Sequence, residues 1–364
     1  MVEEIVLRCA LAKEFLYRPA LANRLMEEFG SAVEIFRNAG DLDLEDVSVS
    51  LARAFSDTML EWAAEEVGWC AEKGVELIFY GEKRYPVLLA EISNAPFMLY
   101  YKGTANPNQA RSVSMVGTRL ASAYGKEMCG SIVGHISDYR PLVVSGLAYG
   151  IDIAAHKAAL EAGVQTIGVL PNGIDMIYPS RHRDIAAQMV QNGGILTEFP
   201  RGEQPVKLNF IKRNRIIAAM SQGLVVVESR VKGGSMITAE YASNFNRDVF
   251  AVPGRFADTN SFGCNYLIAK NVAAIYNSPA VIPSALGWEK NYLPDSNYQL
   301  ELFSSEMSHK EKLLLSLKFD KPTVVEKLCA ETGFDWEEVS ILLLELELEG
   351  KITVKNNTDY YLSR

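Results

Sequence analysis

Short runs of apolar residues alternate with amphipathic stretches between residues 113 and 254. The apolar runs are VSMVG (113–117), LVVSG (142–146), TIGVL (166–170), ILTEF (195–199), LVVVES (224–229) and VFAVPG (249–254). The amphipathic stretches cover residues 122–136, 151–162, 183–192, 214–221 and 235–245. Continuous apolar strands separated by amphipathic helices are typical of a parallel sheet with helices on both faces. The pattern predicts an α/β fold, a Rossmann-like, doubly wound, mainly parallel sheet whose ligands bind beyond the carboxyl ends of the strands.

The residues before this region predict a helical module and two further strands. Apolar stripes with helical spacing fill residues 1–64, and Gly30 is expected to end the second helix, while a third stripe runs from Leu51 to Trp69. VELIFY (75–80) and Met98–Tyr101 are expected to be strands. Modules of the helix-hairpin-helix or SAM type sometimes bind DNA through a glycine-rich hairpin. The connecting turn here is YRPA (17–20), which lacks those glycines, so a structural role is favoured.

The residues after the sheet predict a linker and a winged helix. Pro, Gly, Asn and Ser are frequent in residues 279–304. Residues 305–364 contain helical patterns at Lys310–Leu317, Val324–Glu331 and Trp336–Glu349, followed by a hairpin with Asn356-Asn357 at its turn. The third helix, DWEEVSILLLELELEG (335–350), carries six acids and no Lys or Arg. Such a helix is repelled by a phosphate-lined groove, so a partner-binding or regulatory role fits better.

These patterns divide the chain into four parts. They are an N-terminal helical module (1–64), a Rossmann-like domain (65–278), a linker (279–304) and a winged-helix domain (305–364).

Charge is distributed unevenly along the chain. The whole chain of 364 residues has a net charge of −9. Residues 1–110 have 10 basic and 18 acidic residues, a net of −8, and residues 111–206 have 8 of each. Residues 207–255 have 8 basic and 3 acidic residues, a net of +5, whereas residues 256–364 have 10 and 16, a net of −6. The positive charge is concentrated in one window, which indicates a local anionic partner.

Other classes of protein are disfavoured by the composition. No apolar run reaches 18 residues, and the chain does not start with a cationic segment followed by an apolar one, so no membrane span or secretory signal is expected. The five cysteines are scattered without a CxxC pair, and the four histidines do not cluster. We therefore expect a reduced cytoplasmic protein without a metal or cofactor.

KLNFIKRNRII (207–217) is the basic stretch of the positive window. Lys207, Lys212, Arg213 and Arg215 place four cations in nine residues around Phe210. A charge run is usually a solvated helix face. The aromatic ring among these cations also fits a site for an anion that carries a flat ring.

Three strand-to-helix turns are rich in glycine. Gly117-Thr118-Arg119 follows the first strand of the parallel region, Ser145–Gly150 follows the second, and Lys232–Ser235 follows the fifth. Glycines let the backbone approach an anion, which the free amides of the next helix then bind. Since the carboxyl ends of parallel strands share one edge of the sheet, we expect the three turns to form a site for several phosphates.

An enzyme is the rival interpretation. The dinucleotide fingerprint is absent from GTRLAS (117–122), and no Walker A motif occurs. GGSMITAE (233–240) has the spacing of a GG-x-G-T-x-x-E motif of nucleotide phosphoribohydrolases, although Met236 and Ile237 do not match it. Candidate general acids are Glu198, Glu228 and Glu240. Asp152 is interpreted as a first-turn acid of its helix and His156, on the same face, as a hydrogen-bonded core residue.

A colinear series of motifs between residues 70 and 277 resembles the DprA (Smf) family of DNA-processing proteins. The motifs are VSMVGTR, SGLAYGIDIAAHKAAL, TIGVLPNGIDMIYPSRH, LTEFPRGEQP, NFIKRNRIIAAMS, VVVESRVKGGSMITAEYA, RDVFAVPG and SFGCNYLIA. The resemblance implies an extended Rossmann fold that binds single-stranded DNA, forms a homodimer and loads the recombinase RecA in natural transformation. The family is not known as an enzyme, and many members have both flanking modules.

The family motifs can be placed on this chain. Its G-S-R motif corresponds to Gly117-Thr118-Arg119, and its F-P-x-R-N-R-I-I motif to residues 210–217, where Ile211 replaces Pro. Its YP-x-x-N segment corresponds to residues 178–182, where His182 replaces Asn, and its S-G-S-L-I-T motif to residues 233–238. The G-A pair that follows the N-x-L-I segment is replaced here within Asn271–Ala274.

These arguments give one hypothesis for the site. Cations contact phosphates, the turns add amides, and Phe210 stacks a base, a contact worth roughly 1–3 kcal/mol. The residues expected to bind single-stranded DNA are Gly117, Thr118, Arg119, Ser122, Ser145, Gly146, Gly150, Arg181, Arg183, Asn209, Phe210, Lys212, Arg213, Asn214, Arg215, Gly233, Gly234, Ser235 and Thr238. Arg213 and Arg215 are not expected to share one role, and one of them is expected to pair with Glu198 or Glu228. Tyr266, Leu267 and Ile268 are candidates for the dimer interface, with burial in the core as the alternative.

Overall fold

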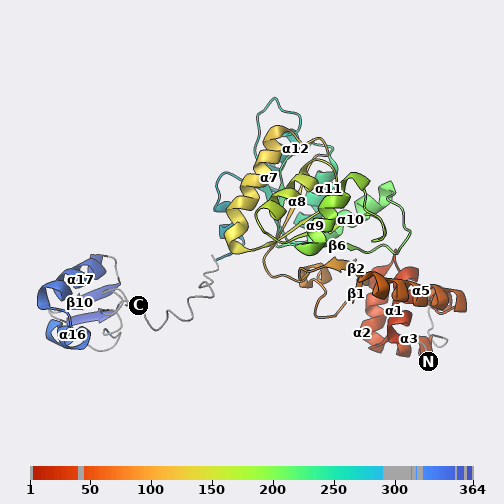
Figure 1. Cartoon of the computed structure of the whole chain (residues 1–364), viewed down its shortest axis with the longest axis horizontal. Coiled ribbons are helices and arrows are strands. Elements are labelled where there is room, and N and C mark those ends of the chain that lie inside the picture. Colours follow the sequence, from red (N-terminus) through yellow and green to blue (C-terminus); the bar gives the residue numbers. More distant parts are fainter. Residues whose placement is uncertain are drawn as a thin grey trace. The chain divides into compact units, whose positions relative to one another are not determined.

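The computed structural model divides the chain into two compact units, residues 1–291 and 292–364 (Figure 1). It describes residues 3–39, 45–289, 313, 317, 323–348, 351–355 and 359–362. None of the helices in these ranges is both long and apolar enough to cross a membrane.

The first unit is built on a sheet of nine strands, counted over the described residues. The strands are β1 (Glu76–Phe79), β2 (Met98–Gly103), β3 (Ser112–Val116), β4 (Leu142–Ser145), β5 (Thr166–Val169), β6 (Gly193–Thr197), β7 (Gly223–Val226), β8 (Asp248–Ala251) and β9 (Ala274–Ile275). Their order is β1-β2-β6-β5-β4-β3-β7-β8-β9. The pairs from β6 to β9 are parallel, and β1 and β2 are added antiparallel at one edge. The predicted doubly wound, mainly parallel sheet is confirmed, with β9 as an additional short strand.

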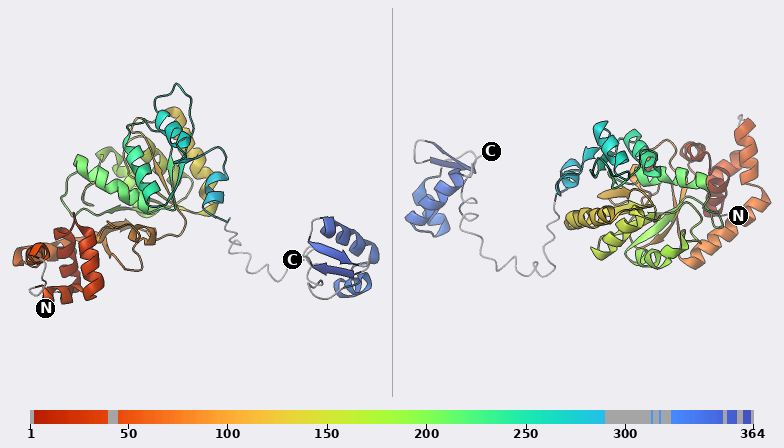
Figure 2. Two further views of the ribbon diagram at one scale, coloured as in Figure 1. Left: turned by 180° about the vertical axis from the view of Figure 1, so that it is seen from behind. Right: turned by 90° about the horizontal axis from the view of Figure 1, so that it is seen from above.

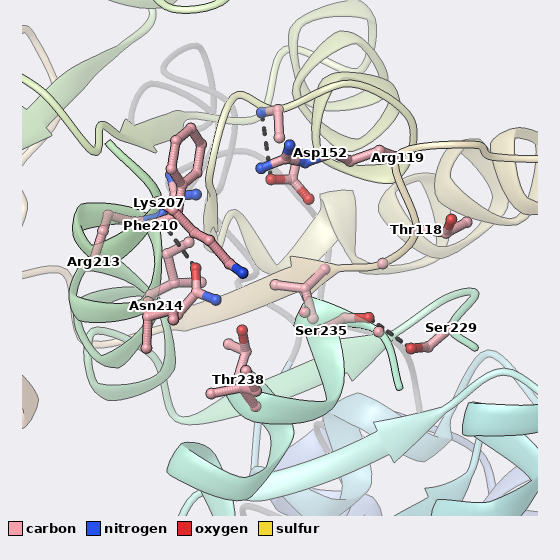
Figure 3. A pocket seen from close by; sticks show the side chains of 18 of the residues that line it. Thr118, Arg119, Asp152, Lys207, Phe210, Arg213, Asn214, Ser229, Ser235 and Thr238 are labelled. Atoms are coloured by element: carbon pink, nitrogen blue, oxygen red, sulfur yellow. Dashed lines mark hydrogen bonds between the residues drawn. The ribbon is translucent and has the colours of Figure 1, made fainter. Parts of the chain in front are cut away.

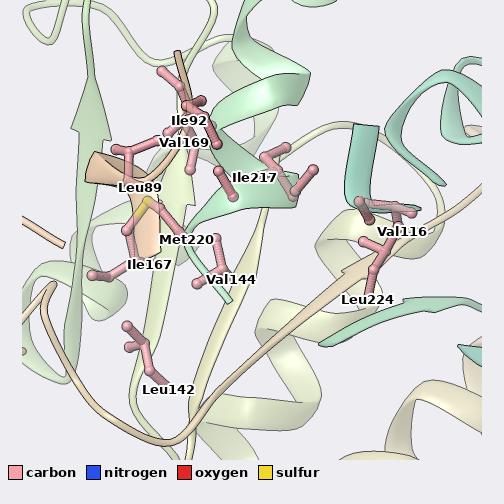
Figure 4. Close-up of a cluster of buried hydrophobic side chains, with 14 of the residues drawn as sticks. Leu89, Ile92, Val116, Leu142, Val144, Ile167, Val169, Ile217, Met220 and Leu224 are labelled. Atoms are coloured by element: carbon pink, nitrogen blue, oxygen red, sulfur yellow. The ribbon is translucent and has the colours of Figure 1, made fainter. Parts of the chain in front are cut away.

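Helices cover both faces of the sheet, as the views from behind and above show (Figure 2). They are α6 (Val87–Ala90), α7 (Ala123–Ile136), α8 (Ile151–Glu161), α9 (Arg183–Gln191), α10 (Lys207–Ala219), α11 (Gly234–Asn244), α12 (Phe262–Ala269) and α13 (Val281–Ala285), with two single 3-10 turns, η1 (Ser137–Tyr139) and η2 (Ser180–His182). Val116 of β3 packs with α10 and α11, whereas Val113 and Met115 pack with α7 and α8. This alternation follows from the two-residue period of a strand. Figure 4 shows the first of these cores, to which Ile217 of α10, Met220 at the C-cap of α10, and Val144 and Val169 of the sheet all belong.

The N-terminal helices pack on the same unit. They are α1 (Glu4–Glu14), α2 (Pro19–Phe29), α3 (Ala32–Asn38), α4 (Glu45–Ala54) and α5 (Asp57–Lys73), and their apolar residues share one core with β1, β2, β6 and α9. Gly30 ends α2 in the left-handed conformation, as predicted. The continuous third helix predicted over 51–69 is wrong: it is interrupted before Ser56, the N-cap of α5. α5 also continues past the expected domain boundary at residue 64.

The predicted start of the linker, at residue 279, lies inside the first unit. Residues 279–289 do not leave the first unit, because Ile282 of α13 is fully buried and Trp288 donates from Nε1 to Oε1 of Gln222 at 2.8 Å. Both residues belong to the core under α7 and α8. Proline and glycine here shape a packed chain end rather than a flexible linker. Residues 290–304 lie outside the described part of the chain.

The second unit contains the predicted helix and hairpin pattern. Its described elements are α16 (Val325–Thr332), α17 (Trp336–Leu348), β10 (Ile352–Lys355) and β11 (Asp359–Leu362), and β10 pairs antiparallel with β11. Leu313, Leu317, Leu328, Val339 and Leu343 are among the residues that form its core. Most of the predicted helix at 310–317 and the Asn356-Asn357 turn lie outside the described residues.

Candidate nucleic-acid interface

A pocket of about 890 Å³ opens beyond the carboxyl ends of β3 and β7, between α10 and α11 (Figure 3). This is the edge where the parallel sheet predicts a ligand. Among its lining residues, all in the described part of the chain, five are cationic and one is acidic, Asp152. The cations are Arg119, Lys207, Arg213, Arg230 and Lys232. The pocket is therefore a concave, positively charged surface on an acidic protein.

All three glycine-rich turns contribute to the pocket, as predicted. Gly117 and Thr118 come from the first turn, Ala148 from the second, and Gly233 and Gly234 from the third. Ten of the nineteen predicted binding residues line it: Gly117, Thr118, Arg119, Phe210, Arg213, Asn214, Gly233, Gly234, Ser235 and Thr238. The strand order explains this convergence, because β3 lies between β4 and β7.

Phe210 lies on α10 at the centre of the cationic groups. The guanidinium carbon of Arg119 is 4.9 Å from the centroid of its ring, and that of Arg213 is 5.8 Å away. The ring of Tyr178, which is 40% exposed, meets Phe210 edge-to-face at 5.9 Å between centroids. An aromatic platform surrounded by guanidinium groups can stack a base and contact its phosphates.

α10 begins at Lys207, seven residues before the predicted start at 214. The amphipathic period was hidden because Asn209, Arg213 and Arg215, all polar, occupy the buried side of this helix. A helix whose inner face is polar gives no apolar stripe in the sequence. This early start places Lys207 and Phe210 on the helix rather than in a preceding loop.

Arg213 forms the base of the pocket. Its Nη1 donates to the carbonyl oxygens of Gly146, at 2.7 Å, and of Val169, and its Nε donates to Oδ1 of Asn214 at 3.3 Å. Burial lowers the pKa of this guanidinium to about 10, an effect that the nearby Asp152 opposes. Burial also raises the pKa of Asp152, and Arg213 opposes that shift. Asp152 accepts from the amide of Ala148 at 3.4 Å, which agrees with its interpretation as a first-turn acid.

Three other polar residues of α10, Arg215, Lys212 and Asn209, lie outside the pocket lining. Arg215 forms a buried ion pair with Glu198, whose side chain is 1% exposed, which confirms that one of the two arginines ties the helix to an acid. The ammonium of Lys212 lies 3.8 Å from the centroid of the Tyr17 ring and donates to the carbonyl of Leu16. Asn209 donates to Glu203 and to the carbonyl of Gln204. These three residues hold α10 in place instead of lining the pocket.

Polar groups at the N-terminal ends of α7 and α8 form hydrogen bonds within the protein. Glu228 accepts from the amide and the hydroxyl of Ser122, the N-cap of α7, at 2.9 and 2.6 Å. The amide of Ile151 donates to the carbonyl of Thr118 at 3.1 Å. By contrast, α11 begins at the pocket with Gly233 as its N-cap and no side-chain cap. The start of α11 is therefore the helix N-terminus best placed to bind an anion.

The glycines of the first two turns accommodate protein atoms. A Cβ on Gly117 would lie 2.5 Å from Ile151, and one on Gly146 would lie 2.6 Å from the guanidinium of Arg213. Gly150 has φ +81°, and its Cβ would lie 2.1 Å from the carbonyl oxygen of Thr118. Packing within the protein therefore explains the glycines at these positions, whereas a Cβ on Gly234 would meet nothing within 4 Å.

The other predicted binding residues lie outside the pocket lining. Ser145 is buried and donates from its hydroxyl to the carbonyl of Met115. Arg181 and Arg183 are exposed on η2 and at the start of α9, shortly after Tyr178. Tyr178, Lys207 and Arg230 line the pocket although they were not among the nineteen. The signal for Arg230 was its position in the turn between β7 and α11, four residues after the end of the strand.

The candidate acids of the enzyme interpretation do not line this pocket. Glu198 is paired with Arg215, and Glu228 accepts two hydrogen bonds from Ser122. Glu240 is exposed and lines a separate groove of about 530 Å³ between α11 and α12. His156 is fully buried and its Nδ1 hydrogen-bonds the hydroxyl of Thr166 at 2.7 Å, as expected of a core histidine.

Two of the three predicted dimer residues, Tyr266 and Leu267, line the second groove. Tyr266 is 47% exposed and lines it, Leu267 is buried in the core, and Ile268 is half-buried. The core alternative therefore holds for Leu267, and Tyr266 is available to a partner.

Comparison with known proteins agrees with the motifs. The family described as DNA recombination-mediator protein A matches residues 76–286, and the DprA winged helix domain matches residues 307–355. Protein Smf of Escherichia coli (strain K12) is 35% identical over 289 residues, which are 78% of this chain and 76% of that protein.

Two solved structures are similar to the chain. The crystal structure of DNA processing protein A (DprA) from Streptococcus pneumoniae has a TM-score of 0.65 and 30% identity, and the match covers 77% of this chain and 96% of that one. The second is DNA processing protein A from Helicobacter pylori, whose structure concerns its single-stranded DNA binding mode. It has a TM-score of 0.54 and 27% identity, and the match covers 59% of this chain and 97% of that one. Sequence, fold and winged helix agree, and the chain belongs to the DprA (Smf) family of DNA-processing proteins.

Proposed function

We propose that this protein binds single-stranded DNA in the pocket between α10 and α11. The observation that carries the proposal is Phe210, a half-buried ring among five cationic residues and a single acidic one in the pocket lining. Stacking tolerates any base, and cations around the ring neutralise the phosphates on either side of it. The relation to the Helicobacter pylori protein, studied for single-stranded DNA binding, supports the same ligand.

The pocket residues take different roles in this proposal. Arg119, Lys207 and Lys232 are exposed and contact phosphates, and the uncapped start of α11 adds the amides of Gly234 and Ser235. Phe210 stacks a base, with Tyr178 beside it. Arg213, at the base of the pocket, adds positive electrostatic potential, and its hydrogen bond to the carbonyl oxygen of Gly146 fixes the second turn. Arg181 and Arg183 are exposed and extend the cationic surface beyond the pocket.

A matched pair of lysines on α10 tests this assignment. Lys207 lines the pocket, whereas Lys212 packs on Tyr17 on another side of the same helix. The logarithm of the affinity for an oligo-dT strand falls with the logarithm of salt concentration, by about 0.7 for each phosphate neutralised. Lys207→Gln is expected to flatten this slope by about 0.7, and Lys212→Gln to leave it unchanged. Equal slopes for wild type and Lys207→Gln would contradict phosphate contact in this pocket.

We further propose that the protein acts without catalysing a reaction on the DNA. Nucleotide hydrolysis needs a positioned acid or base, and the three candidate glutamates are occupied elsewhere or lie outside the pocket. Wild-type protein is expected to release neither base nor phosphate from a panel of nucleotides. Turnover that is lost in Glu240→Gln would establish the nucleotide phosphoribohydrolase alternative.

The proposal includes a homodimer formed through the groove at α12. Tyr266, Val272 and Val231 are exposed apolar side chains around this groove, an arrangement that suits a second copy of the chain. Tyr266→Glu is expected to give a folded monomer in sedimentation experiments. Because Tyr266 is exposed, a folded variant that stays dimeric would rule out this surface.

Loading of RecA onto bound DNA in the cytoplasm, during recombination and natural transformation, completes the proposal. It predicts that the protein shortens the lag of RecA ATPase on strands covered by single-stranded DNA-binding protein. An unchanged lag would leave DNA binding as the only activity. On α17, Ile341, Leu344 and Glu345 are exposed on one side of the helix, and this apolar and acidic surface suits a protein partner better than duplex DNA.

A further inference from the structure

Phe256 is an exposed aromatic side chain that the pocket does not use. Its exposed fraction is 95%, the highest among the large apolar side chains of the described residues. It lies in the loop between β8 and α12, which extends beyond α7 and α12 (Figure 1). Arg255, the preceding residue, is also exposed. A ring with this exposure packs against little of the protein and is accessible to a ligand.

The loop that carries Phe256 is firmly attached. The amide of Asp258 donates to the carbonyl of Arg255 at 3.1 Å, and the amide of Ser261 donates to the carbonyl of Asp258 at 2.8 Å. At its beginning, Gly254 and the side chain of Asn265 exchange two hydrogen bonds, at 3.2 and 3.0 Å. The ring is therefore presented on an ordered turn, which lowers the entropy lost when it contacts a ligand.

Asn260 joins this loop to the rim of the DNA pocket. Its carbonyl accepts from the amide of Ser229 at 2.6 Å, and its side-chain amide donates to the carbonyl of Leu120 at 3.0 Å. Ser229 and Arg230 line the pocket, and Leu120, 71% exposed, follows Arg119 in the turn after β3. The Phe256 loop is thus bonded to both turns that form this side of the pocket.

Between the pocket and the Phe256 loop, cationic and aromatic side chains occur together, as they do in the pocket itself. Arg119 and Phe210 are followed by Arg230 at the rim and by Arg255 and Phe256 on the loop. Aromatic rings spaced between cations are the pattern by which proteins follow a single strand, because every base stacks and every phosphate carries the same charge. Asp258 is the one acid of the loop, and Arg255 and Arg230 outweigh it.

We propose that the strand leaves the pocket over Arg230 and that the Arg255-Phe256 loop forms a second subsite, where Phe256 stacks a base and Arg255 contacts a phosphate. This inference rests on the proposed DNA binding in the pocket. A second copy of the chain is the other possible occupant of an exposed ring, and the alternation of cations with rings favours the strand.

The test measures dissociation constants for oligo-dT strands from about 4 to 16 nucleotides, the range of known single-strand sites. Phe256→Ala is expected to bind the shortest strands like wild type. It is expected to bind the longest about five- to 160-fold more weakly, the loss that corresponds to one stacked base at roughly 1–3 kcal/mol. Arg255→Gln should lower the salt slope by about 0.7 on the longest strands only. Val87→Ala and Arg24→Gln, exposed on other elements, are the controls and should change neither quantity.

Each other outcome is also decisive. Unchanged affinity of Phe256→Ala at every length, while Phe210→Ala binds weakly, would refute the second subsite and leave the pocket intact. An equal loss at all lengths together with a halved mass in solution would show that Phe256 contacts a second copy. Wild-type protein that binds no strand would refute the proposed function itself.

Discussion

The buried pair of Arg215 and Glu198 offers the sharpest test of how the basic helix is used. Both residues were candidates for function, yet they contact each other inside the protein, with side chains that are 4% and 1% exposed. One guanidinium nitrogen and one carboxylate oxygen of the pair have no hydrogen-bond partner within the described residues. The pair is thus incompletely satisfied, and its charges are costly to bury.

Arg215→Met removes one charge and leaves the other in the interior. Breaking a buried pair in this way costs about 3–5 kcal/mol, a large part of a typical folding free energy of about 5–15 kcal/mol. At about 2–4 °C per kcal/mol, the melting temperature of the first unit should fall by roughly 6–20 °C. The double variant Arg215→Met, Glu198→Leu removes both charges and should recover most of this loss or exceed wild type.

Thermal unfolding followed by circular dichroism measures these shifts, and fluorescence anisotropy at low temperature measures strand binding by the folded variants. The double variant should bind oligo-dT with the wild-type salt slope, because neither side chain reaches the pocket. The reasoning would be refuted by an Arg215→Met protein that melts like wild type and whose salt slope is flatter by about 0.7. That result would mean that Arg215 contacts a phosphate.

Three further predictions follow from the structure. His156 has a pKa lowered to about 3 by burial. The unfolded chain therefore takes up the proton first, so wild type should lose about 2 kcal/mol relative to His156→Gln between pH 8 and pH 5, as measured by urea unfolding. Gly150→Ala should weaken both folding and strand binding, because its Cβ would displace Thr118. Its control, Gly163→Ala, also has a positive φ but lies in open space, so it should lower the free energy of unfolding by about 1 kcal/mol and leave strand binding unchanged. Residues 1–290 alone should retain strand affinity in gel shifts, because this unit contains the whole pocket.

Much of the fold was decided locally and could be predicted from the sequence. Runs such as LVVSG and TIGVL are too apolar and too short for anything but buried strands, and the helices between them require a parallel sheet. The location of the site followed from the same pattern, because parallel strands bring their carboxyl ends to one edge. Two boundaries were missed for local reasons: Ser56 starts a new helix inside an apolar stripe, and polar residues fill the buried side of α10.

The roles of individual residues could be read only from the tertiary structure. In the sequence, the four cations of residues 207–215 look equivalent. In the fold, Lys207 lines the pocket, and Lys212 packs on Tyr17. Arg213 forms the base of the pocket, and Arg215 pairs with Glu198. The glycines of the three turns look alike as well, yet Gly150 makes room for Thr118 and Gly234 faces open space. Strand direction and periodicity are local properties, so the order of residues along the chain is enough to gather cations and glycines at one edge of the sheet. Which of them remain available to a ligand depends on the side chains and carbonyl groups that distant segments place beside them, and only tertiary packing supplies those contacts.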